Sequence, residues 1–319
     1  MKKLFYSLIF LTFFVSFSSC TKEVDIAIPG FKEQLVVDGS IETGMPPIVI
    51  LSRSRDIFST TNLESFLSSF VTNANVYVSD GTNEYQLSLL CSSSLPAGTE
   101  DFVASFLGIP VEELSQYNIC AYSSLNPSIW GQTGKTYTLR IEHEGKEYTG
   151  STQILQPHSL DNLWWQEENN NNPGFGFSYA TLSDNASTYD AYKWEVKRIN
   201  KINDSTIIDS YFKPTFNAVF EDEFFNGKTF TFYFENPWTV GNSQLNTNQR
   251  GRYQIGDTVV VKFSKIDEGT YDFLYSKTIQ ALSSGNPFAS AMNVKTNLNG
   301  GCLGVWAGYS PTYDTLICQ

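Results

Sequence analysis

Charged residues are scarce in this sequence, and basic residues are scarcer than acidic ones. Only 17% of the 319 residues are charged, with 21 Lys and Arg against 33 Asp and Glu. If Lys2 and Lys3 leave with an N-terminal signal, 19 basic residues remain and the net charge becomes −14. Such a surface repels phosphate backbones and anionic lipid headgroups, so nucleic acid is a poor partner.

Long apolar runs are also lacking, apart from one short run near the start. Residues 4–17 carry no charge and follow the basic start Met1-Lys2-Lys3. This run is too short to span about 30 Å of hydrocarbon, but it suits a secretory signal. No later segment approaches the roughly 18 apolar residues of a membrane-spanning helix. The sequence therefore predicts export without a transmembrane span.

The end of this run, Phe17-Ser18-Ser19-Cys20, resembles a bacterial lipobox. We expect residues 1–19 to be a lipoprotein signal peptide and Cys20 to be acylated, which anchors the protein in the outer membrane. The alternative is an ordinary cleaved signal that leaves Cys20 as a free thiol or a disulfide partner.

Residues 20–30 form a predicted tether that begins with charged positions. Lys22, Glu23 and Asp25 resemble the export signal that places Bacteroidota lipoproteins on the cell surface. The alternative is a solvated tether without a signal.

Cysteine usage fits an oxidising compartment. Without Cys20, the chain keeps Cys91, Cys120, Cys302 and Cys318, an even number in an exported protein. Four cysteines allow three connectivities. Cys91–Cys120 and Cys302–Cys318 are favoured, because each pair brackets one local segment. A zinc site is the alternative, although the sequence has no CxxC spacing.

The body of the chain has the alternation of β-strands. Apolar and polar side chains alternate in the segments 137–142, 192–197, 229–234 and 259–263. Hairpin-turn pairs lie between such segments at Asp80-Gly81, Glu144-Gly145 and Asn226-Gly227. One polar face on each strand favours antiparallel sheets.

Helices are expected to be few. A capping-box spacing starts an apolar stripe over residues 61–70, and a second stripe covers residues 270–282. Short helical turns are expected between Cys91 and Cys120, where Pro110 precedes acidic residues.

The predicted fold is mainly β, with two domains that meet at residues 156–159. Residues 31–156 are predicted to form an immunoglobulin-like antiparallel β-sandwich. Residues 157–319 are predicted to form a second β-rich domain with one helix. The boundary is placed there because Pro157 ends an apolar-alternating strand.

Several local motifs occur in a fixed order along the mature chain. They are Leu35-Val36-Val37-Asp38-Gly39, Pro46-Pro47-Ile48-Val49, residues 74–81, Phe225-Asn226-Gly227-Lys228, Gly285-Asn286-Pro287-Phe288 and Val305-Trp306-Ala307-Gly308-Tyr309-Ser310. Behind a lipobox, this ordered set resembles the Bacteroidota lipoproteins called domain of unknown function 4249. The chain departs from them at Ala307, where a second Gly is usual, and in its cysteine-bracketed insertion. The resemblance implies an outer-membrane lipoprotein, often encoded beside TonB-dependent receptors, and it implies no reaction.

Residues for catalysis or metal binding are sparse. The two histidines, His143 and His158, are interpreted as exposed loop residues without a role. HExxH and GxSxG motifs are absent, which argues against a zincin or an α/β-hydrolase. Residues 221–223 are acidic and could contribute to a calcium site, but a solvated turn is favoured. We expect no cofactor, no metal and no enzymatic activity.

Tryptophans are the remaining candidates for a binding site. Trp164 and Trp165 are adjacent, so in a strand they point to opposite faces. At least one of them then packs between domains, stays partly exposed or forms a platform for a ligand or partner. Trp238 and Trp306 carry the same alternatives.

The sequence thus predicts a lipid-anchored binding or accessory protein at the outer membrane, exposed at the cell surface. The expected partner is a TonB-dependent transporter. A structural subunit of another envelope complex and a surface hydrolase are the alternatives.

Overall fold

The computed structural model describes residues 31–55, 67–95, 98–114, 116–168, 172–202, 206–283 and 293–319. The chain divides into two units, Met1–Lys32 and Glu33–Gln319, and the second is described below. Several predictions lie outside the described residues. They are the signal peptide, Cys20, the tether with Lys22, Glu23 and Asp25, and most of the helix predicted over residues 61–70.

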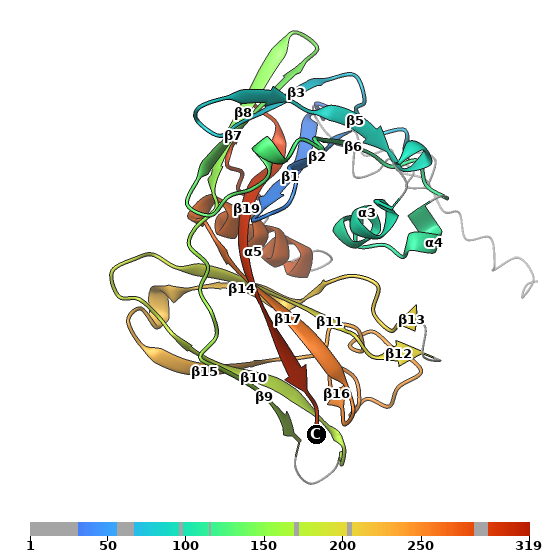
Figure 1. The fold of residues 1–319 in the computed structure, drawn as a ribbon, viewed down its shortest axis with the longest axis vertical. Coiled ribbons are helices and arrows are strands. Elements are labelled where there is room, and N and C mark those ends of the chain that lie inside the picture. Colours follow the sequence, from blue (N-terminus) through green and yellow to red (C-terminus); the bar gives the residue numbers. More distant parts are fainter. Residues whose placement is uncertain are drawn as a thin grey trace, which may run out of the picture. The chain divides into compact units, whose positions relative to one another are not determined.

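An eight-stranded sheet runs through the unit Glu33–Gln319 (Figure 1). Its strands, in spatial order, are β14 (Lys213–Glu221), β11 (Ala191–Arg198), β17 (Thr258–Ile266), β19 (Leu303–Ile317), β1 (Leu35–Glu42), β2 (Ile48–Arg53), β6 (Cys120–Ser123) and β5 (Ser88–Cys91).

The last strand, β19, joins the two parts of this sheet because it is 15 residues long. Its first half pairs in parallel with β1, with Val36 opposite Leu303 and Glu42 opposite Tyr309. Its second half pairs antiparallel with β17. The other pairings between the described strands are antiparallel.

A five-stranded antiparallel sheet packs against the β1–β2 side. It contains β18 (Leu298–Asn299), β8 (Lys146–Gln153), β7 (Thr136–His143), β3 (Asn75–Ser79) and β4 (Glu84–Gln86). The β7–β8 hairpin turns at Glu144 and Gly145, whose φ angles are 50° and 73°, and Gly81 has φ 87°. Both turns occur where the sequence predicted them, because these residue pairs tolerate positive φ.

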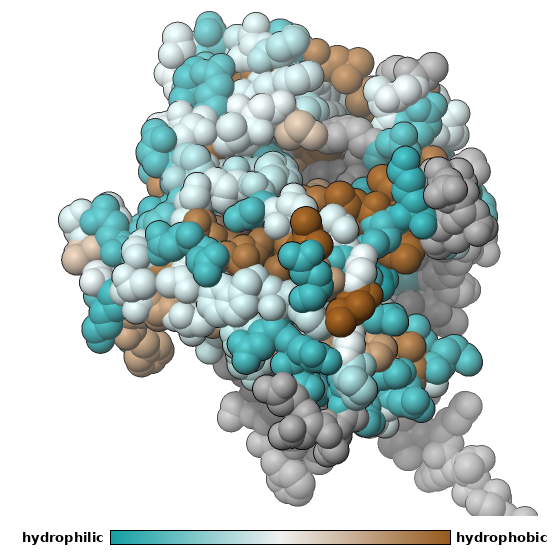
Figure 2. Space-filling model, turned by 60° about the horizontal axis from the view of Figure 1, so that its bottom comes forward, coloured by the Kyte–Doolittle hydropathy of each residue, from teal (hydrophilic) through white to brown (hydrophobic). Residues whose placement is uncertain are grey.

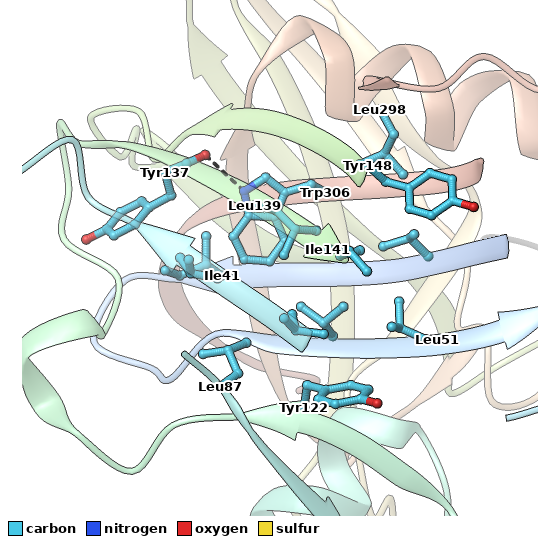
Figure 3. Packing of buried hydrophobic residues seen from close by; sticks show 14 of the residues in the cluster. Ile41, Leu51, Leu87, Tyr122, Tyr137, Leu139, Ile141, Tyr148, Leu298 and Trp306 are labelled. Carbon is cyan, nitrogen blue, oxygen red and sulfur yellow. Dashed lines mark hydrogen bonds between the residues drawn. The ribbon is translucent and has the colours of Figure 1, made fainter. Parts of the chain in front are cut away.

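The first hydrophobic core lies between these two sheets (Figure 3). It contains alternate residues of β7, namely Tyr137, Leu139 and Ile141, together with Trp306 of β19. Trp306 is fully buried, and its indole Nε1 donates a hydrogen bond to the carbonyl of Tyr137 (3.0 Å). A C-terminal residue therefore completes a core made mostly by the N-terminal half.

A smaller antiparallel sheet covers the other end of the eight-stranded sheet. Its strands are β15 (Thr229–Phe234), β10 (Phe175–Ser183), β16 (Tyr253–Gln254) and β9 (Asn162–Glu167). Between the two sheets lies the second core, where Trp194 contacts Phe232, Phe234 and Phe263 at ring-centroid distances of 5.1–6.1 Å. A short hairpin, β12 (Lys201–Ile202) and β13 (Thr206–Ile207), is attached to this part.

One long helix, α5 (Glu268–Ser283), confirms the helix predicted over residues 270–282. Asp267 accepts a hydrogen bond from the amide of Thr270 (2.8 Å), and its other carboxylate oxygen accepts from Thr152 on β8 (2.6 Å). Asp267 therefore caps the helix and fastens it to the five-stranded sheet.

Short helices account for the rest of the helical structure. They are α3 (Glu100–Leu107) and α4 (Val111–Leu114), with the 3₁₀ turns η2 (Ser92–Ser94), η3 (Pro127–Ile129) and η4 (Asp222–Phe224). α3 and α4 lie in the cysteine-bracketed segment, where the sequence predicted helical turns. No helix among the described residues is both long and apolar enough to cross a membrane.

The fold is mainly β with antiparallel sheets and one long helix, which confirms the predicted fold class. The parallel β1–β19 pair departs from the antiparallel pattern. The domain boundary at residues 156–159 stays a prediction.

Candidate functional site

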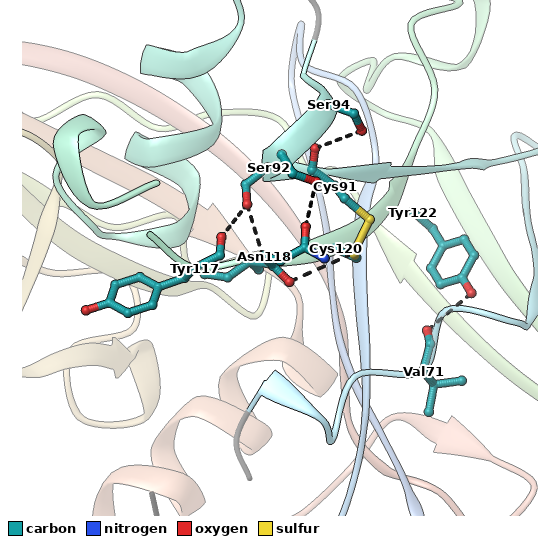
Figure 4. The surroundings of a disulfide bond; sticks show 10 residues. Val71, Cys91, Ser92, Ser94, Tyr117, Asn118, Cys120 and Tyr122 are labelled. Atoms are coloured by element: carbon teal, nitrogen blue, oxygen red, sulfur yellow. Dashed lines mark hydrogen bonds between the residues drawn. A yellow bond between two sulfur atoms is a disulfide. The ribbon is translucent and has the colours of Figure 1, made fainter. Parts of the chain in front are cut away.

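The predicted disulfide between Cys91 and Cys120 is present and joins β5 to β6 (Figure 4). The two residues are direct register partners, with a Cα–Cα distance of 4.0 Å. Nearby, the hydroxyl of Ser92 donates to the carbonyl of Tyr117, and the amide of Ile119 donates to the Ser92 hydroxyl (3.1 Å). The β5–β6 strand pair is therefore fixed by both covalent and hydrogen bonds.

The predicted bridge between Cys302 and Cys318 is wrong in this structure, where both are free thiols. They flank the 15-residue strand β19, and an extended strand of that length separates them by about 50 Å. A disulfide requires Cα atoms within about 7 Å. The two thiols are also buried in different cores, Cys302 in the first and Cys318 in the second. The two cysteines bracket one local segment, which suggested a disulfide, but that segment is a single long strand that keeps them apart.

Trp306 is not a platform for a ligand, because it lies fully buried in the first core. Trp238 is half-buried, and its Nε1 donates to the carbonyl of Val196 (3.3 Å). Tyr211 lies 4.8 Å from the Trp238 ring centre, and the Lys213 ammonium lies 5.1 Å from it. These contacts fix Trp238 in the fold.

Trp164 and Trp165 are both half-buried on β9 and face opposite sides, as the alternation predicts. Trp165 packs against the second core, whereas Trp164 stacks on Tyr179 at 5.6 Å. Tyr179 in turn lies 5.4 Å from Tyr233, which lies 5.3 Å from Phe177. We call Trp164, Tyr179, Tyr233 and Phe177 the outer aromatic row.

The prediction that both histidines are exposed loop residues is wrong. His143 ends β7 and is buried, because it continues the inward face of Tyr137, Leu139 and Ile141. His158 is half-buried, and its Nδ1 lies 3.1 Å from the hydroxyl of Tyr192.

The acidic residues 221–223 do not form a fully solvated turn, because Asp222 is buried. One carboxylate oxygen of Asp222 has no hydrogen-bond partner among the described residues. Burial raises the pKa of this carboxyl above its ordinary value, with the nearby Asp184 and Asp190 carboxylates adding to the shift. Within the described parts of the chain, no group of three or more His, Cys, Asp or Glu side chains is placed to hold a metal ion.

The strongest candidate for a binding site is a groove of about 770 Å³ between β14, β15 and α5, which we call the aromatic groove. Its wall on β14, η4 and the loop that follows includes Phe220, Phe224 and Phe225. Its wall on β15 includes Phe230, Phe232 and Phe234. Its wall on α5 includes Tyr271, Tyr275 and Leu282.

The groove exists because one edge of the second sandwich stays open. β14 is the edge of the eight-stranded sheet, and β15 is the edge of the smaller sheet. Phe230, Phe232 and Phe234 alternate toward the second core but remain half-buried at this edge. Phe225 and Phe230 lie 3.9 Å apart between ring centres, and Phe220 lies 5.3 Å from Phe232.

Exposure makes these rings available for contact. Phe224 is 84% exposed, and Tyr233, Tyr275 and Leu282 are about half exposed. Figure 2 shows that hydrophobic residues gather in patches bordered by hydrophilic ones on the face that it draws. Contiguous exposed apolar patches on a folded protein mark interaction sites more often than single exposed residues do.

The charged rim of the aromatic groove is acidic. Glu221 and Glu223 line it, and no Lys or Arg does so among the described lining residues. The Tyr189 hydroxyl donates to Glu221 (2.7 Å). The pKa of Tyr271 is raised, mainly by burial and in addition by the nearby Glu221 carboxylate, so this phenol stays protonated near neutral pH. The groove thus combines ring faces with negative charge, which suits an apolar segment flanked by basic residues.

The sequence predicted the walls of this groove separately, but not that they lie against one another. Phe230, Phe232 and Phe234 were predicted to share one strand face. Tyr271, Tyr275 and Leu282 were predicted to share one helix face. Both patterns are typical of core packing. The signal in the sequence was the number of aromatic residues on the strand face and on the helix face, together with Phe224 and Phe225.

Comparison with known proteins bears on the whole folded body. No curated protein matches the chain. A family model described as Domain of unknown function (DUF4249) matches residues 21–314, which include all the elements of the aromatic groove. The chain therefore belongs to the DUF4249 family.

Proposed function

We propose that this protein is a lipid-anchored binding or accessory protein of the bacterial outer membrane that acts through a stable protein partner. The partner we propose is a TonB-dependent transporter. The lipobox at Cys20 supports the anchor, and the aromatic groove supports the partner. The observation that carries the proposal is an open sandwich edge that exposes many aromatic rings.

The aromatic groove fits a protein segment better than it fits a small polar substrate. Its walls are mostly Phe and Tyr, and buried aromatic anchors provide much of the affinity of protein interfaces. The outer aromatic row extends the apolar surface, because Tyr233 belongs to both features. The partner segment is expected to insert apolar side chains and to place Lys or Arg beside Glu221 and Glu223.

The test is affinity purification from membranes in mild detergent, followed by identification of the co-purifying chains. The wild type is compared with Phe224→Asp, which removes the most exposed ring of the groove. Burying a Phe stabilises by about 1.5–3 kcal/mol, so this variant should weaken partner binding at least about tenfold. Ile255→Asp is the matched control, because Ile255 is also exposed and apolar but does not line the groove.

The charge at the rim has a test of its own. Glu223 is exposed, so Glu223→Lys should leave the fold intact while it repels a basic flank. Its effect should weaken as salt is raised, whereas the effect of Phe224→Asp should not.

Three outcomes would overturn parts of the proposal. If the wild type emerges alone across several detergents and growth substrates, the protein is not an accessory subunit. If Phe224→Asp and Ile255→Asp retain the partner equally, the groove is not the docking surface. If Cys20→Ala incorporates as much labelled palmitate as the wild type, the lipid anchor is not at Cys20.

A further inference from the structure

A polar cavity of about 590 Å³ lies over β1, β11, β17 and β19 of the eight-stranded sheet, and α3 and α5 contribute to its walls. It shares no described lining residue with the aromatic groove. Its floor is the sheet face that is turned away from the two cores. Glu42 follows Ile41 of the first core, and Glu195 follows Trp194 of the second core, so both carboxylates leave their strands on the opposite side.

Two ion pairs lie side by side on this floor. The ammonium of Lys193 lies 2.9 Å from Oε1 of Glu195, and that of Lys262 lies 2.5 Å from Oε2 of Glu42. Glu195 and Lys262 are direct register partners on β11 and β17, so the two pairs are neighbours. The cavity therefore presents two ammonium groups and two carboxylates within one small area.

These charged groups are sheltered, but they remain open to the cavity. The four side chains are only 10–17% exposed. Oε2 of Glu195 has no hydrogen-bond donor among the described residues, and it is not closed to solvent. Each Lys ammonium carries three N–H donors, so the ion pair leaves donors for a ligand. Although burial lowers the pKa of Lys193, the Glu195 carboxylate raises it further, so this ammonium stays charged near neutral pH.

Stability alone is a weak explanation for these pairs. Replacing a buried ion pair by apolar residues of similar volume is often neutral or stabilising, because the two charges lose their hydration. Charged groups kept in a partly enclosed cavity are better explained by a ligand that uses them.

Aromatic rings lie beside both ion pairs. The Lys193 ammonium lies 4.8 Å from the ring centre of Tyr309, and the Lys262 ammonium lies 5.7 Å from that of Phe212. The ring of Tyr313 lies 5.9 Å from that of Phe212 and is about half exposed. The face of an aromatic ring carries partial negative charge, which suits the C–H groups of a ligand.

Charge balance narrows the class of ligand. Asp38 and Lys277 also line the cavity, so its described lining residues include three basic and three acidic side chains and have no net charge. A ligand with a single charge would lie against like charge in one of the pairs, which is costly. A hydroxyl group instead donates to a carboxylate and accepts from an ammonium. The volume lies within the range of about 300–1,000 Å³ that is typical of small-molecule sites.

We propose that this cavity binds a neutral saccharide. Its hydroxyl groups bond to the Lys193–Glu195 and Lys262–Glu42 pairs, and its C–H face packs against the ring of Tyr313. This site is independent of the partner proposed for the aromatic groove.

The test is calorimetric titration of neutral disaccharides into the full chain carrying Cys20→Ala, so that no detergent is present. The probes are maltose, cellobiose, lactose, xylobiose, mannobiose and diacetylchitobiose. We expect saturable one-site binding of at least one of them with a Kd of about 1 mM or tighter. The uronic-acid and amino-sugar analogues of that disaccharide should bind at least about tenfold more weakly, because their charge lacks a free partner. Dialanine is the zwitterionic arm.

Two variants locate the ligand in the cavity. Lys193→Met combined with Glu195→Gln removes both charges at once, so it should keep the urea midpoint of the wild type while it weakens saccharide binding at least about tenfold. Ser40→Trp fills the cavity from β1 and should weaken binding to a similar extent, about tenfold, by removing the space. It decides the question if circular dichroism shows that the first variant is misfolded. Lys295→Met combined with Asp272→Asn is the matched control, because this ion pair does not line the cavity.

Each contrary result counts against the proposal. Absence of saturable binding by all six disaccharides, or tighter binding of dialanine than of any of them, would show that the ligand is not a neutral saccharide. Unchanged binding in either folded cavity variant, or an equal loss in the control, would show that the saccharide does not bind at these ion pairs.

Discussion

The N-terminal half of this protein should not fold without the C-terminal strand. Trp306, Leu298 and Cys302 all belong to the first core, although they lie far beyond residue 157 in the sequence. A fragment of residues 31–157 also removes β19, the parallel partner of β1, and leaves β1 as an edge strand that pairs only with β2. Such a fragment is therefore expected to be unfolded or partly collapsed.

The size of the expected loss of stability can be worked out from Trp306 alone. A buried aromatic side chain removes about 150–250 Å² from water, and at about 25 cal/mol per Å² this contributes about 4–6 kcal/mol. Losing its Nε1 donor also leaves the buried Tyr137 carbonyl without that bond, at a cost of about 1–3 kcal/mol. Domains are stable by only about 5–15 kcal/mol, so these losses take most of what is available.

Urea unfolding followed by circular dichroism provides the assay. In the full chain, Trp306→Ala should lower the free energy of unfolding by about 3–5 kcal/mol. This is less than the sum above, because area-based values are upper bounds and Ala keeps its Cβ in the core. Trp164→Ala is the matched control and should cost less, because Trp164 is only half-buried. A fragment of residues 31–157 that unfolds cooperatively and gives a dispersed NMR spectrum would refute the reasoning.

The remaining predictions concern thiols and buried charges. Cys302 and Cys318 should react with an alkylating agent in denaturant without reductant, as mass spectrometry would show, and resistance to alkylation would contradict their free state. Hydrogen bonds from two backbone amides and a Lys ammonium lower the pKa of Asp80 from 3.8 to about 2. Asp80→Ala should therefore lower the free energy of unfolding by about 2 kcal/mol at pH 7. In urea titrations, the difference from the wild type should shrink as the pH falls from about 4 to 2. A difference that stays constant over this range would contradict the prediction. Arg198→Ala should destabilise by about 3–5 kcal/mol in the same assay, because it leaves the buried carboxylate of Asp209 unpaired, and a loss below about 1 kcal/mol would argue against that.

Local features of the fold could be predicted because their causes are local. Asp80-Gly81 and Glu144-Gly145 turn where expected, since positive φ is a property of the turn residues themselves. The helix over residues 270–282 follows from an apolar stripe that repeats with the helical period. The Cys91–Cys120 bridge joins two strands that follow one another along the chain and are neighbours in the sheet, so bracketing one segment was a valid guide here.

Long-range features could not be predicted, because nothing local encodes them. The parallel pairing of Val36 with Leu303 joins opposite ends of the folded body, and it places Trp306 in the first core. Cys302 and Cys318 looked like a local pair, but the segment between them turned out to be a single strand. His143 is different, since its i+2 spacing from Ile141 was a signal of burial that the exposed-loop interpretation overlooked.

The geometry of β14 also bears on how a partner would engage the aromatic groove. Its register with β11 shifts between Lys193 and Glu195, and Asn217 adopts φ 54° within the shifted stretch. A bulge of this kind bends an edge strand and interrupts the straight row of amides and carbonyls that an added strand needs. The open edge is thus poorly suited to strand addition along β14, while its Phe and Tyr rings remain accessible. Recognition at the groove should therefore depend on apolar side chains inserted between the rings, which is why Phe224→Asp, and not a change of the β14 backbone, is the decisive variant.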